Sequence, residues 1–520
     1  MENKSGVSYN KNIKCADVHT ESAAEYILPD YLGDVRKILF TSAAVRPAGR
    51  FMGGDRAECS GIVVYNMIYL DAEDNLSSAE FTSDYDYTVK CPCESCRDMQ
   101  ADTRVSGYSI RLSGPRKISA KASVVGSVRM SCDEEISLGG DCAEGREDLE
   151  TSTSRLNIRH TEQSGAVERE YAESLIKLDS AIAEEVSVVY CDAKAVVESA
   201  ECCDSAVSLK GKLRMSAVIK NGEAGAFLSE KVVNFEESVP FEKVDSEMKL
   251  IPETVVTSLK PSVNATEEGC EVVLSGIVEL SVSGEKNDVC EVITDGYLKS
   301  CESECSYGEL CYCEMVDVIS AKGSHSATIP RAEIETGRLR EVVFLTAEPK
   351  VDSISCEGDG VKIVGEVKYS GVASELDEEG SISYVMLKFS SPFDTNVNVS
   401  CQNPEKTRFE LKVNAHSAGA SIDSDNLYAS CVLDCSLTVC EEKEERILAS
   451  MNAKEDEAYS KEGAKITVYY PTAEDTLFSV AKRFHTSAVK VASDNSLTES
   501  VMSRENSEGS LQGVKKLLIY

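Results

Sequence analysis

The sequence predicts a mainly β protein, with three tandem antiparallel β-rich, sandwich-like repeat units followed by a small α+β module of strand–helix–helix–strand order. Three observations support this fold class. Long stretches alternate apolar and polar residues with a period of two and are rich in Val, Ile and Thr, which is typical of strands with one buried face. Runs of this kind recur at a spacing of roughly 150 residues, which indicates an internal repeat. Near the C-terminus the apolar spacing becomes that of short helices.

The repeat rests on two anchors that share one register. The first anchor is an apolar run that ends in alanine, with offsets of 150 and 154 residues between its copies: Ile38–Ala43, Val188–Ala193 and Val342–Ala347. The second is a glycine inside an alternating run, with the same offsets: Gly61, Gly211 and Gly365. Because glycine weakens the interior of a strand, we interpret each of these three as a bulge or a close crossing of two strands.

The anchors divide the chain into four predicted parts. We expect β-rich units at residues 24–166, 167–329 and 330–456, and the C-terminal module at residues 464–520. The segment Ala453–Gly463 is polar and charged and has no apolar period, so it is the predicted linker to the module.

Charge and composition exclude several classes of partner. The chain has 54 basic and 89 acidic residues, which gives a formal charge of −35. Nucleic acid and anionic membrane surfaces repel such a chain, so a neutral or basic protein is the more plausible partner. The first residues contain no apolar signal-peptide core and no run approaches a membrane span, so we expect a cytoplasmic protein whose 21 cysteines are thiols.

The motifs that carry chemistry elsewhere are weak here. A cysteine run at Cys91, Cys93 and Cys96 would supply zinc ligands if it met a second group, for which the candidates are Cys301, Cys305, Cys311 and Cys313. No second pair stands at a fixed distance, and the matching stretch Val239–Phe241 has no cysteine, so we expect incidental loop thiols and no metal. The five histidines are scattered singly, and we expect no catalytic residue, no cofactor and no enzyme activity.

The C-terminal module is predicted in detail. Strands are expected at Ile466–Tyr470 and Val514–Tyr520, with a first helix that ends at Phe484 and a second at Ser487–Ser493. Glu474 or Asp475 is expected to cap the first helix, and Thr486 or Ser487 the second.

The two loops that flank this helix pair are expected to lie side by side and to form a shallow groove for a ligand or partner. The predicted groove residues are Pro471, Thr472, Ala473, Glu474, Asp475, Thr476, Asn495, Ser496 and Leu497.

These residues carry a resemblance to known families. The runs Ile466–Tyr470, Asp475–Phe484 and Lys516–Ile519, with Asn495 between them, resemble the LysM family along its full length. The run Ile27–Leu39 looks like the leader of the SPOCS domain, which is repeated in clostridial spore-coat morphogenesis proteins. Tandem SPOCS repeats followed by one LysM domain are the layout of the SipL type.

The resemblance implies a non-enzymatic scaffold or adaptor in spore-coat assembly. It would lie in the mother-cell cytoplasm at the forespore surface, where its LysM domain would dock onto a coat morphogenetic ATPase without inserting into the membrane. The alternative is a LysM protein that binds peptidoglycan or another N-acetylglucosamine glycan. LysM domains usually have Pro-Gly where this chain has Ala473 and Glu474, and the added carboxylate moves the expected ligand from glycan towards protein.

Overall fold

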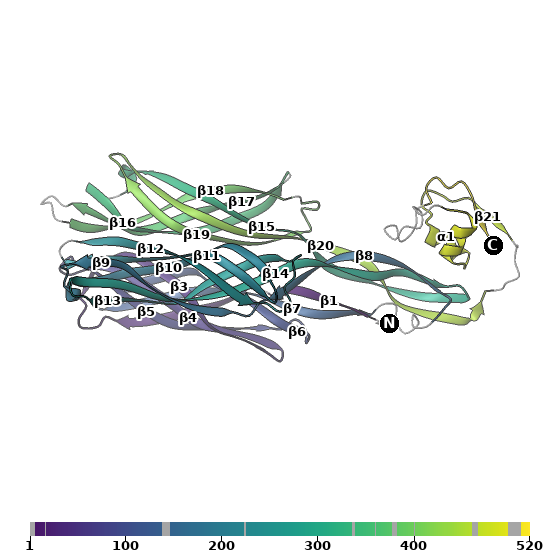
Figure 1. Cartoon of the computed structure of the whole chain (residues 1–520), viewed down its shortest axis with the longest axis horizontal. Helices are drawn as coiled ribbons and strands as arrows, with labels where there is room; N and C mark the ends of the chain where they lie inside the picture. Colours follow the sequence, from purple (N-terminus) through teal and green to yellow (C-terminus); the bar gives the residue numbers. More distant parts are fainter. Residues whose placement is uncertain are drawn as a thin grey trace.

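The computed structural model describes residues 6–15, 17–137, 146–222, 225–334, 338–358, 360–376, 382–399, 401–459, 466–497 and 511–520. It is mainly antiparallel β-sheet and has two short helices near the C-terminus, which confirms the expected fold class at this level (Figure 1). Long strands form the body of the molecule, and the two helices lie in a small unit at its far end. Among the described residues no helix is both long and apolar enough to cross a membrane.

One three-stranded sheet occurs three times with the same strand order, and each copy contains the two sequence anchors. Its first strand bears the apolar run and its middle strand bears the glycine. The copies are β3–β4–β5 (Val35–Gly53, Arg56–Asp71, Leu76–Lys90), β10–β11–β12 (Val186–Cys203, Ala206–Asn221, Ala226–Pro240) and β16–β17–β18 (Arg338–Glu357, Gly360–Leu376, Ile382–Asn398).

A second kind of sheet is built around one long strand in each third of the chain. These central strands are β7 (Lys117–Ser137), β14 (Gly269–Leu298) and β20 (Asn426–Ala458). Strand β7 pairs with β1 (Gly6–Lys14), β2 (Val18–Ile27) and β6 (Cys96–Leu112). Strand β14 pairs with β8 (Leu149–Gln163), β9 (Val167–Asp179) and β13 (Lys249–Ala265), and β20 pairs with β15 (Cys301–Pro330) and β19 (Thr407–Ile422).

The long strands continue beyond the body as two-stranded ribbons. The second half of β14 pairs with β8, and the end of β20 pairs with the start of β15. Strand pairing therefore crosses two predicted unit boundaries, those between residues 166 and 167 and between residues 329 and 330. Strand β8 precedes the first boundary but pairs with β14 of the second unit, and nearly all of β15 precedes the second boundary although it pairs with β20 of the third unit. The predicted linker is wrong over residues 453–458, which form the end of β20.

The three repeat glycines lie at close strand crossings, as expected from the sequence. A Cβ atom at Gly61, Gly211 or Gly365 would lie under 3.0 Å from a carbonyl oxygen of the neighbouring strand and from an aromatic ring. The pairing register also shifts directly beyond each glycine, as a β-bulge does. Glycine is required at these positions because any side chain would push the two strands apart.

Equivalent residues of the three repeats meet in one aromatic cluster. The rings of Phe40, Tyr190 and Phe344, which hold the same position in the first anchor, have centroids 5.0 to 5.3 Å apart in every pairing. Such distances are typical of favourable edge-to-face and offset contacts. The three rings belong to a buried cluster with residues from all three copies of the three-stranded sheet, so the three repeats pack against one another at a shared core.

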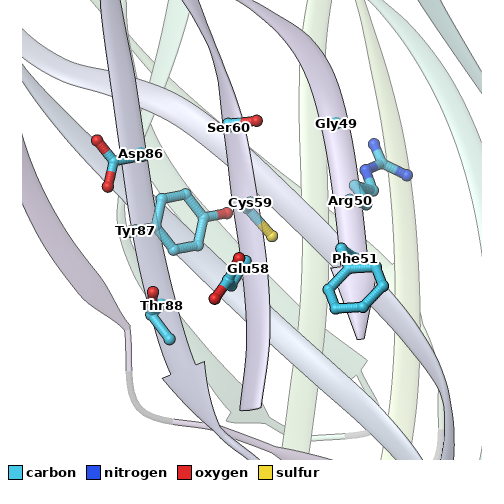
Figure 2. Close-up of a pocket in the computed structure, with 9 residues that line it drawn as sticks. All are labelled: Gly49, Arg50, Phe51, Glu58, Cys59, Ser60, Asp86, Tyr87 and Thr88. Atoms are coloured by element: carbon cyan, nitrogen blue, oxygen red, sulfur yellow. The ribbon is translucent and has the colours of Figure 1, made fainter. Parts of the chain in front are cut away.

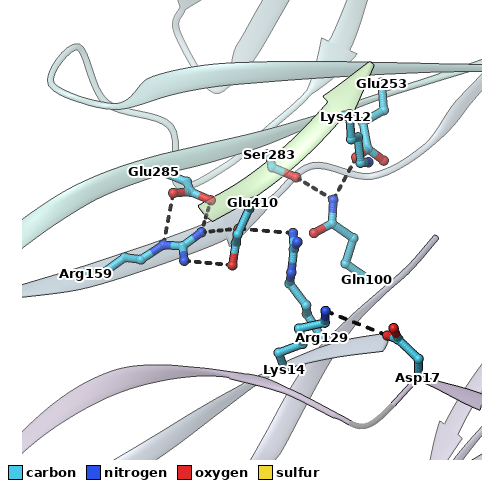
Figure 3. Close-up of polar contacts among 10 residues, drawn as sticks. All are labelled: Lys14, Asp17, Gln100, Arg129, Arg159, Glu253, Ser283, Glu285, Glu410 and Lys412. Carbon is cyan, nitrogen blue, oxygen red and sulfur yellow. Dashed lines mark hydrogen bonds and ion pairs between the residues drawn. The ribbon is translucent and has the colours of Figure 1, made fainter. Parts of the chain in front are cut away.

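A buried ion-pair network joins the second kind of sheet from the three thirds of the chain (Figure 3). Arg159 on β8 donates to Glu285 on β14 at 2.5 and 3.0 Å, and to Glu410 on β19 at 2.9 and 3.1 Å. Arg129 on β7 lies 3.1 Å from Glu410. Two cations face two carboxylates here, so the network is neutral as a whole.

Candidate functional site

The C-terminal module has the predicted element order. Strands β21 (Thr467–Tyr469) and β22 (Leu517–Ile519) pair antiparallel, and helices α1 (Leu477–Arg483) and α2 (Ala488–Asp494) lie between them in the sequence. Short 3-10 turns occur elsewhere, at Ala183–Glu185 and Arg331–Glu333. The helices form because Leu477, Phe478, Val480 and Ala481 face Val491 and Ala492 in one small buried core.

The cap of α1 differs from the expectation. Thr476 is the N-cap, and its hydroxyl accepts from the Ser479 amide at 3.0 Å while the Ser479 hydroxyl accepts from the Thr476 amide at 2.9 Å. This reciprocal pair is a capping box, in which Ser479 takes the place of the usual Glu or Gln. Neither Glu474 nor Asp475 caps the helix. Ser487 is the N-cap of α2, but its side chain makes no capping hydrogen bond.

Asp475 instead holds the first loop closed. Its carboxylate accepts from the Thr472 amide at 2.7 Å, from the Thr472 hydroxyl at 3.0 Å and from the Tyr469 hydroxyl at 2.8 Å. The Thr472 amide and the Tyr469 hydroxyl hold the pKa of this carboxyl below its ordinary value. Asp475 is buried, so it is a structural residue and offers little surface to a ligand.

Asn495 has a corresponding structural role in the second loop. Its side-chain oxygen accepts from the Leu518 amide at 2.6 Å, and its NH₂ group donates to the carbonyl oxygens of Val491 and Leu518. Both predicted loops are thus tied to the β21–β22 pair, one through Asp475 and Tyr469 and the other through Asn495 and Leu518.

The predicted groove residues therefore divide into two groups. Asp475 and Asn495 hold the fold, and Thr476 caps a helix. The exposed members are Thr472, Ala473, Glu474 and Ser496, while Pro471 and Leu497 are half-buried. The surface available to a partner is smaller than the predicted set.

An exposed apolar face of β21, which we call the ribbon face, was missed in the sequence. Val468 in the middle of this short strand is exposed, as are Ile466 and Tyr470, which flank the strand, and Tyr520, which follows β22. Tyr470 is 69% exposed. The period-two pattern of Ile466–Tyr470 was visible, but it did not show which of the two faces would be covered.

The opposite end of the module is attached to the ribbon of β14. Lys482 on α1 lies 2.6 and 2.7 Å from the carboxylate oxygens of Asp295, and the Tyr297 hydroxyl donates to the Thr486 carbonyl at 2.6 Å. The Tyr297 ring packs edge-on against Phe478, and the ring of His485 stacks on Tyr459. No sequence signal pairs these residues. Lys482 and Asp295, for example, are 187 positions apart in the sequence.

A hollow of about 360 Å³ lies on the first three-stranded sheet and contains polar and ionisable groups (Figure 2). Neighbouring residues of β3, β4 and β5 line it, among them Arg50, Glu58, Cys59 and Tyr87. Burial raises the pKa of the Cys59 thiol, so this sulfur is not an activated nucleophile. Tyr87 donates to or accepts from Thr103 at 2.7 Å, which gives it a structural partner. This hollow gives no support to a catalytic function.

Comparison of the chain with protein-family models, with curated proteins and with solved structures found no match.

Proposed function

We propose that this protein is a non-enzymatic scaffold in spore-coat assembly, in which three SPOCS-like repeats carry a LysM-like module that docks onto a coat morphogenetic ATPase. The observation that carries the proposal is the placement of the module. Within the described residues it is attached through Lys482 and Tyr297, and the ribbon face and the exposed loop residues Thr472, Ala473, Glu474 and Ser496 lie at the tip of a long β body.

The body suits a spacer and assembly surface. Its long paired strands and its buried ion-pair network connect the repeats into one elongated object (Figure 1). A partner bound by the module at one end is therefore connected to the whole body, as an adaptor between two surfaces requires.

The exposed side chains of the module favour a protein partner. Residues 464–520 have seven basic and six acidic residues, whereas the whole chain has a formal charge of −35, so the module is nearly neutral and charge does not determine its partner. The ribbon face offers Ile466, Val468 and Tyr470, and aromatic and aliphatic side chains of this kind are enriched at the centres of protein interfaces.

The second candidate is glycan binding in peptidoglycan. The observation that favours it is the exposure of the Tyr470 and Tyr520 rings, since flat aromatic faces are suited to stacking on sugars. Glu474 stands exposed in the adjacent loop and adds a negative charge that a neutral glycan does not need.

A binding experiment with the full chain separates the two candidates. The chain is mixed with a purified coat ATPase, and separately with purified peptidoglycan, and binding is measured by interferometry and by co-sedimentation. We expect saturable binding to the ATPase that falls at least tenfold in the double variant Val468→Glu, Tyr470→Glu. The control is Val289→Glu, which changes an even more exposed valine on β14 and is expected to bind normally.

Two results would overturn the scaffold proposal. One is saturable sedimentation with peptidoglycan together with no binding to the ATPase. The other is ATPase binding that the ribbon-face double variant leaves unchanged, because the docking surface would then lie elsewhere on the chain.

A further inference from the structure

Thiols from separate segments converge at the junction of β5, β6 and β7. Cys93 lies in the short connection between β5 and β6, Cys96 is the first residue of β6, and Cys132 lies on β7. Their three sulfur atoms are all within 4.8 Å of one another, and those of Cys93 and Cys96 are 3.5 Å apart.

The sheet itself positions two of these thiols. Cys96 and Cys132 are directly opposite each other in the antiparallel pairing of β6 and β7. Side chains at such positions leave the sheet on the same face, with Cβ atoms roughly 5 Å apart. The connection that bears Cys93 is held where it begins, because the Cys91 amide donates to the Asp55 carbonyl at 2.8 Å.

A fourth sulfur lies next to this group. Cys91 is buried in the same hydrophobic cluster as Cys132, and Cys93 and Cys96 pack against that cluster. Cys15, which follows β1, packs against it as well. The first unit thus gathers five thiols in one cluster, and three of them have their sulfur atoms within 4.8 Å of one another.

Packing alone does not require thiols at this position. In the second repeat, Phe241 occupies the place of Cys91, and its amide donates to the Ser205 carbonyl just as the Cys91 amide donates to Asp55. Phe241 is also fully buried. A large apolar side chain therefore closes the same junction in the second repeat, and the cysteines of the first repeat offer a chemistry that packing does not need.

We propose that Cys93, Cys96 and Cys132, with Cys91 as the fourth ligand, bind a structural zinc ion that fixes the β5–β6 connection to β7. Four sulfurs that each lie about 2.3 Å from zinc are about 3.8 Å from one another in a tetrahedron. The sulfurs of Cys93, Cys96 and Cys132 lie within 4.8 Å of one another, so their spacing needs to change by about 1 Å or less, and the Cys91 side chain has to move in to complete the site. Zinc–sulfur bonds form as the thiols release their protons to solvent, and no atom changes oxidation state.

The same group explains why the sequence led to the opposite expectation. Cys132 stands in an ordinary alternating strand, and nothing in its neighbourhood resembles a ligand motif. The candidates considered with the Cys91–Cys96 run were Cys301 to Cys313, which lie on β15 and pair with β20. Only the pairing of β6 with β7 brings the relevant thiol to the run.

Access is compatible with metal entry. Cys93 and Cys96 are half-buried, whereas Cys132 has no exposed surface. An ion can therefore reach the group from the side of the β5–β6 connection.

Metal analysis of the full chain tests the proposal. The protein is purified under reducing conditions without chelator, loaded with Zn²⁺, freed of excess metal and analysed by mass spectrometry. We expect about one zinc ion per chain, as for a closed four-ligand site. The double variant Cys93→Ser, Cys96→Ser is expected to lose it, whereas Cys202→Ser, Cys203→Ser, which changes two exposed neighbouring thiols in the second repeat, should retain it.

Cobalt substitution in the wild-type chain gives a readout that does not depend on whether a variant folds. Co²⁺ bound by four thiolates in a tetrahedron produces intense visible and thiolate charge-transfer absorption, which Zn²⁺ should abolish in a stoichiometric titration. Substitution of Cys91 is expected to weaken the charge-transfer bands, and substitution of Cys15 to leave them intact.

Four results would overturn the proposal in whole or in part. Wild-type protein that binds no metal after loading, metal retained by the Cys93, Cys96 double variant, or a Cys93–Cys96 disulfide that persists in protein purified under reducing conditions would each refute the site. Bands that respond to Cys15 and not to Cys91 would refute the assignment of the fourth ligand.

Discussion

The buried network around Arg159 allows a prediction whose magnitude follows from the structure. Replacement by methionine keeps the aliphatic bulk but removes four charge-assisted hydrogen bonds, two to Glu285 and two to Glu410. Glu410 keeps Arg129 as a partner, whereas Glu285 loses both of its hydrogen bonds to Arg159. The side chains of Arg159 and Glu285 are only 6% and 5% exposed, so water cannot replace the lost partner.

The cost has a ceiling, because an unpaired buried carboxylate can take up a proton. Protonation of a carboxyl of ordinary pKa at pH 7 costs about 3.7 kcal/mol, and at pH 5 it costs about 1 kcal/mol. Removal of one partner from a buried ion pair typically costs roughly 3–5 kcal/mol, which agrees with the first value. We therefore expect Arg159→Met to lower the free energy of unfolding by about 3–4 kcal/mol at pH 7 and by about 1 kcal/mol at pH 5.

The sign of this pH dependence follows from the two carboxyl groups. In the wild type, burial alone would raise the pKa of Glu410, but the hydrogen bonds and charge of Arg159 outweigh burial and lower this pKa. The contribution of Glu410 to stability is therefore present above the ordinary glutamate pKa and is lost as the pH falls through the lowered value. Burial raises the pKa of Glu285 even beside Arg159, and loss of this cation raises it further. The variant thus loses less stability on acidification than the wild type.

Urea unfolding at pH 7 and pH 5, followed by circular dichroism, measures the effect. Arg408→Met is the matched control, since Arg408 makes the same two-pronged contact with Glu442 at an exposed site, and it should cost at most about 1 kcal/mol. Adding Glu285→Gln to Arg159→Met should restore part of the stability at pH 7. A loss that is equal at both pH values, or equal to that of Arg408→Met, would refute the reasoning.

Three further predictions concern the strand crossings and the module. Gly365→Ala should lower the free energy of unfolding by about 1–3 kcal/mol or more, because its Cβ would overlap the Lys350 carbonyl. Gly323→Ala is the control and should be neutral, since a Cβ at Gly323 meets no atom within 4 Å. Equal melting temperatures of the two variants would contradict this reasoning. Asp475→Asn should speed hydrogen exchange in the 472–480 segment, and acid should do the same in the wild type. Because the pKa of Asp475 is lowered, its contribution to stability is present above the ordinary aspartate pKa and is lost as the pH falls through the lowered pKa. Exchange that shows no pH dependence beyond that of the intrinsic rate would count against this role. Tyr297→Ala should free the module from the β14 ribbon and broaden the distance distribution in small-angle scattering of the full chain, while an unchanged distribution would show that Tyr297 does not hold it.

Local features of the fold could be predicted from the sequence, because they depend on neighbouring residues. The strand periodicity, the repeat register and the crossings at Gly61, Gly211 and Gly365 are visible as patterns. The contacts among repeats are not, since Phe40 and Phe344 look like any other apolar strand residues.

The site was predicted less well, because neighbouring residues compete for the same partners. Asp475 and Thr476 are both good N-cap residues, and the choice between them is made by Tyr469 and Thr472, which engage the carboxylate of Asp475 and leave Thr476 to cap α1. Likewise, a thiol such as Cys132 acquires its possible role only through strand pairing.

The aromatic cluster of Phe40, Tyr190 and Phe344 also limits how many copies of the repeat can share one centre. Each ring touches both of the others, so the ring of contacts is closed and a fourth copy would find no free position. Each copy thus contacts the other two, as subunits do in a cyclic trimer, although here the three are joined in one polypeptide. Covalent linkage removes the requirement that the subunits be identical, so one copy is free to gather thiols, another to fill the same place with phenylalanine, and a strand of one to support a module that the others lack.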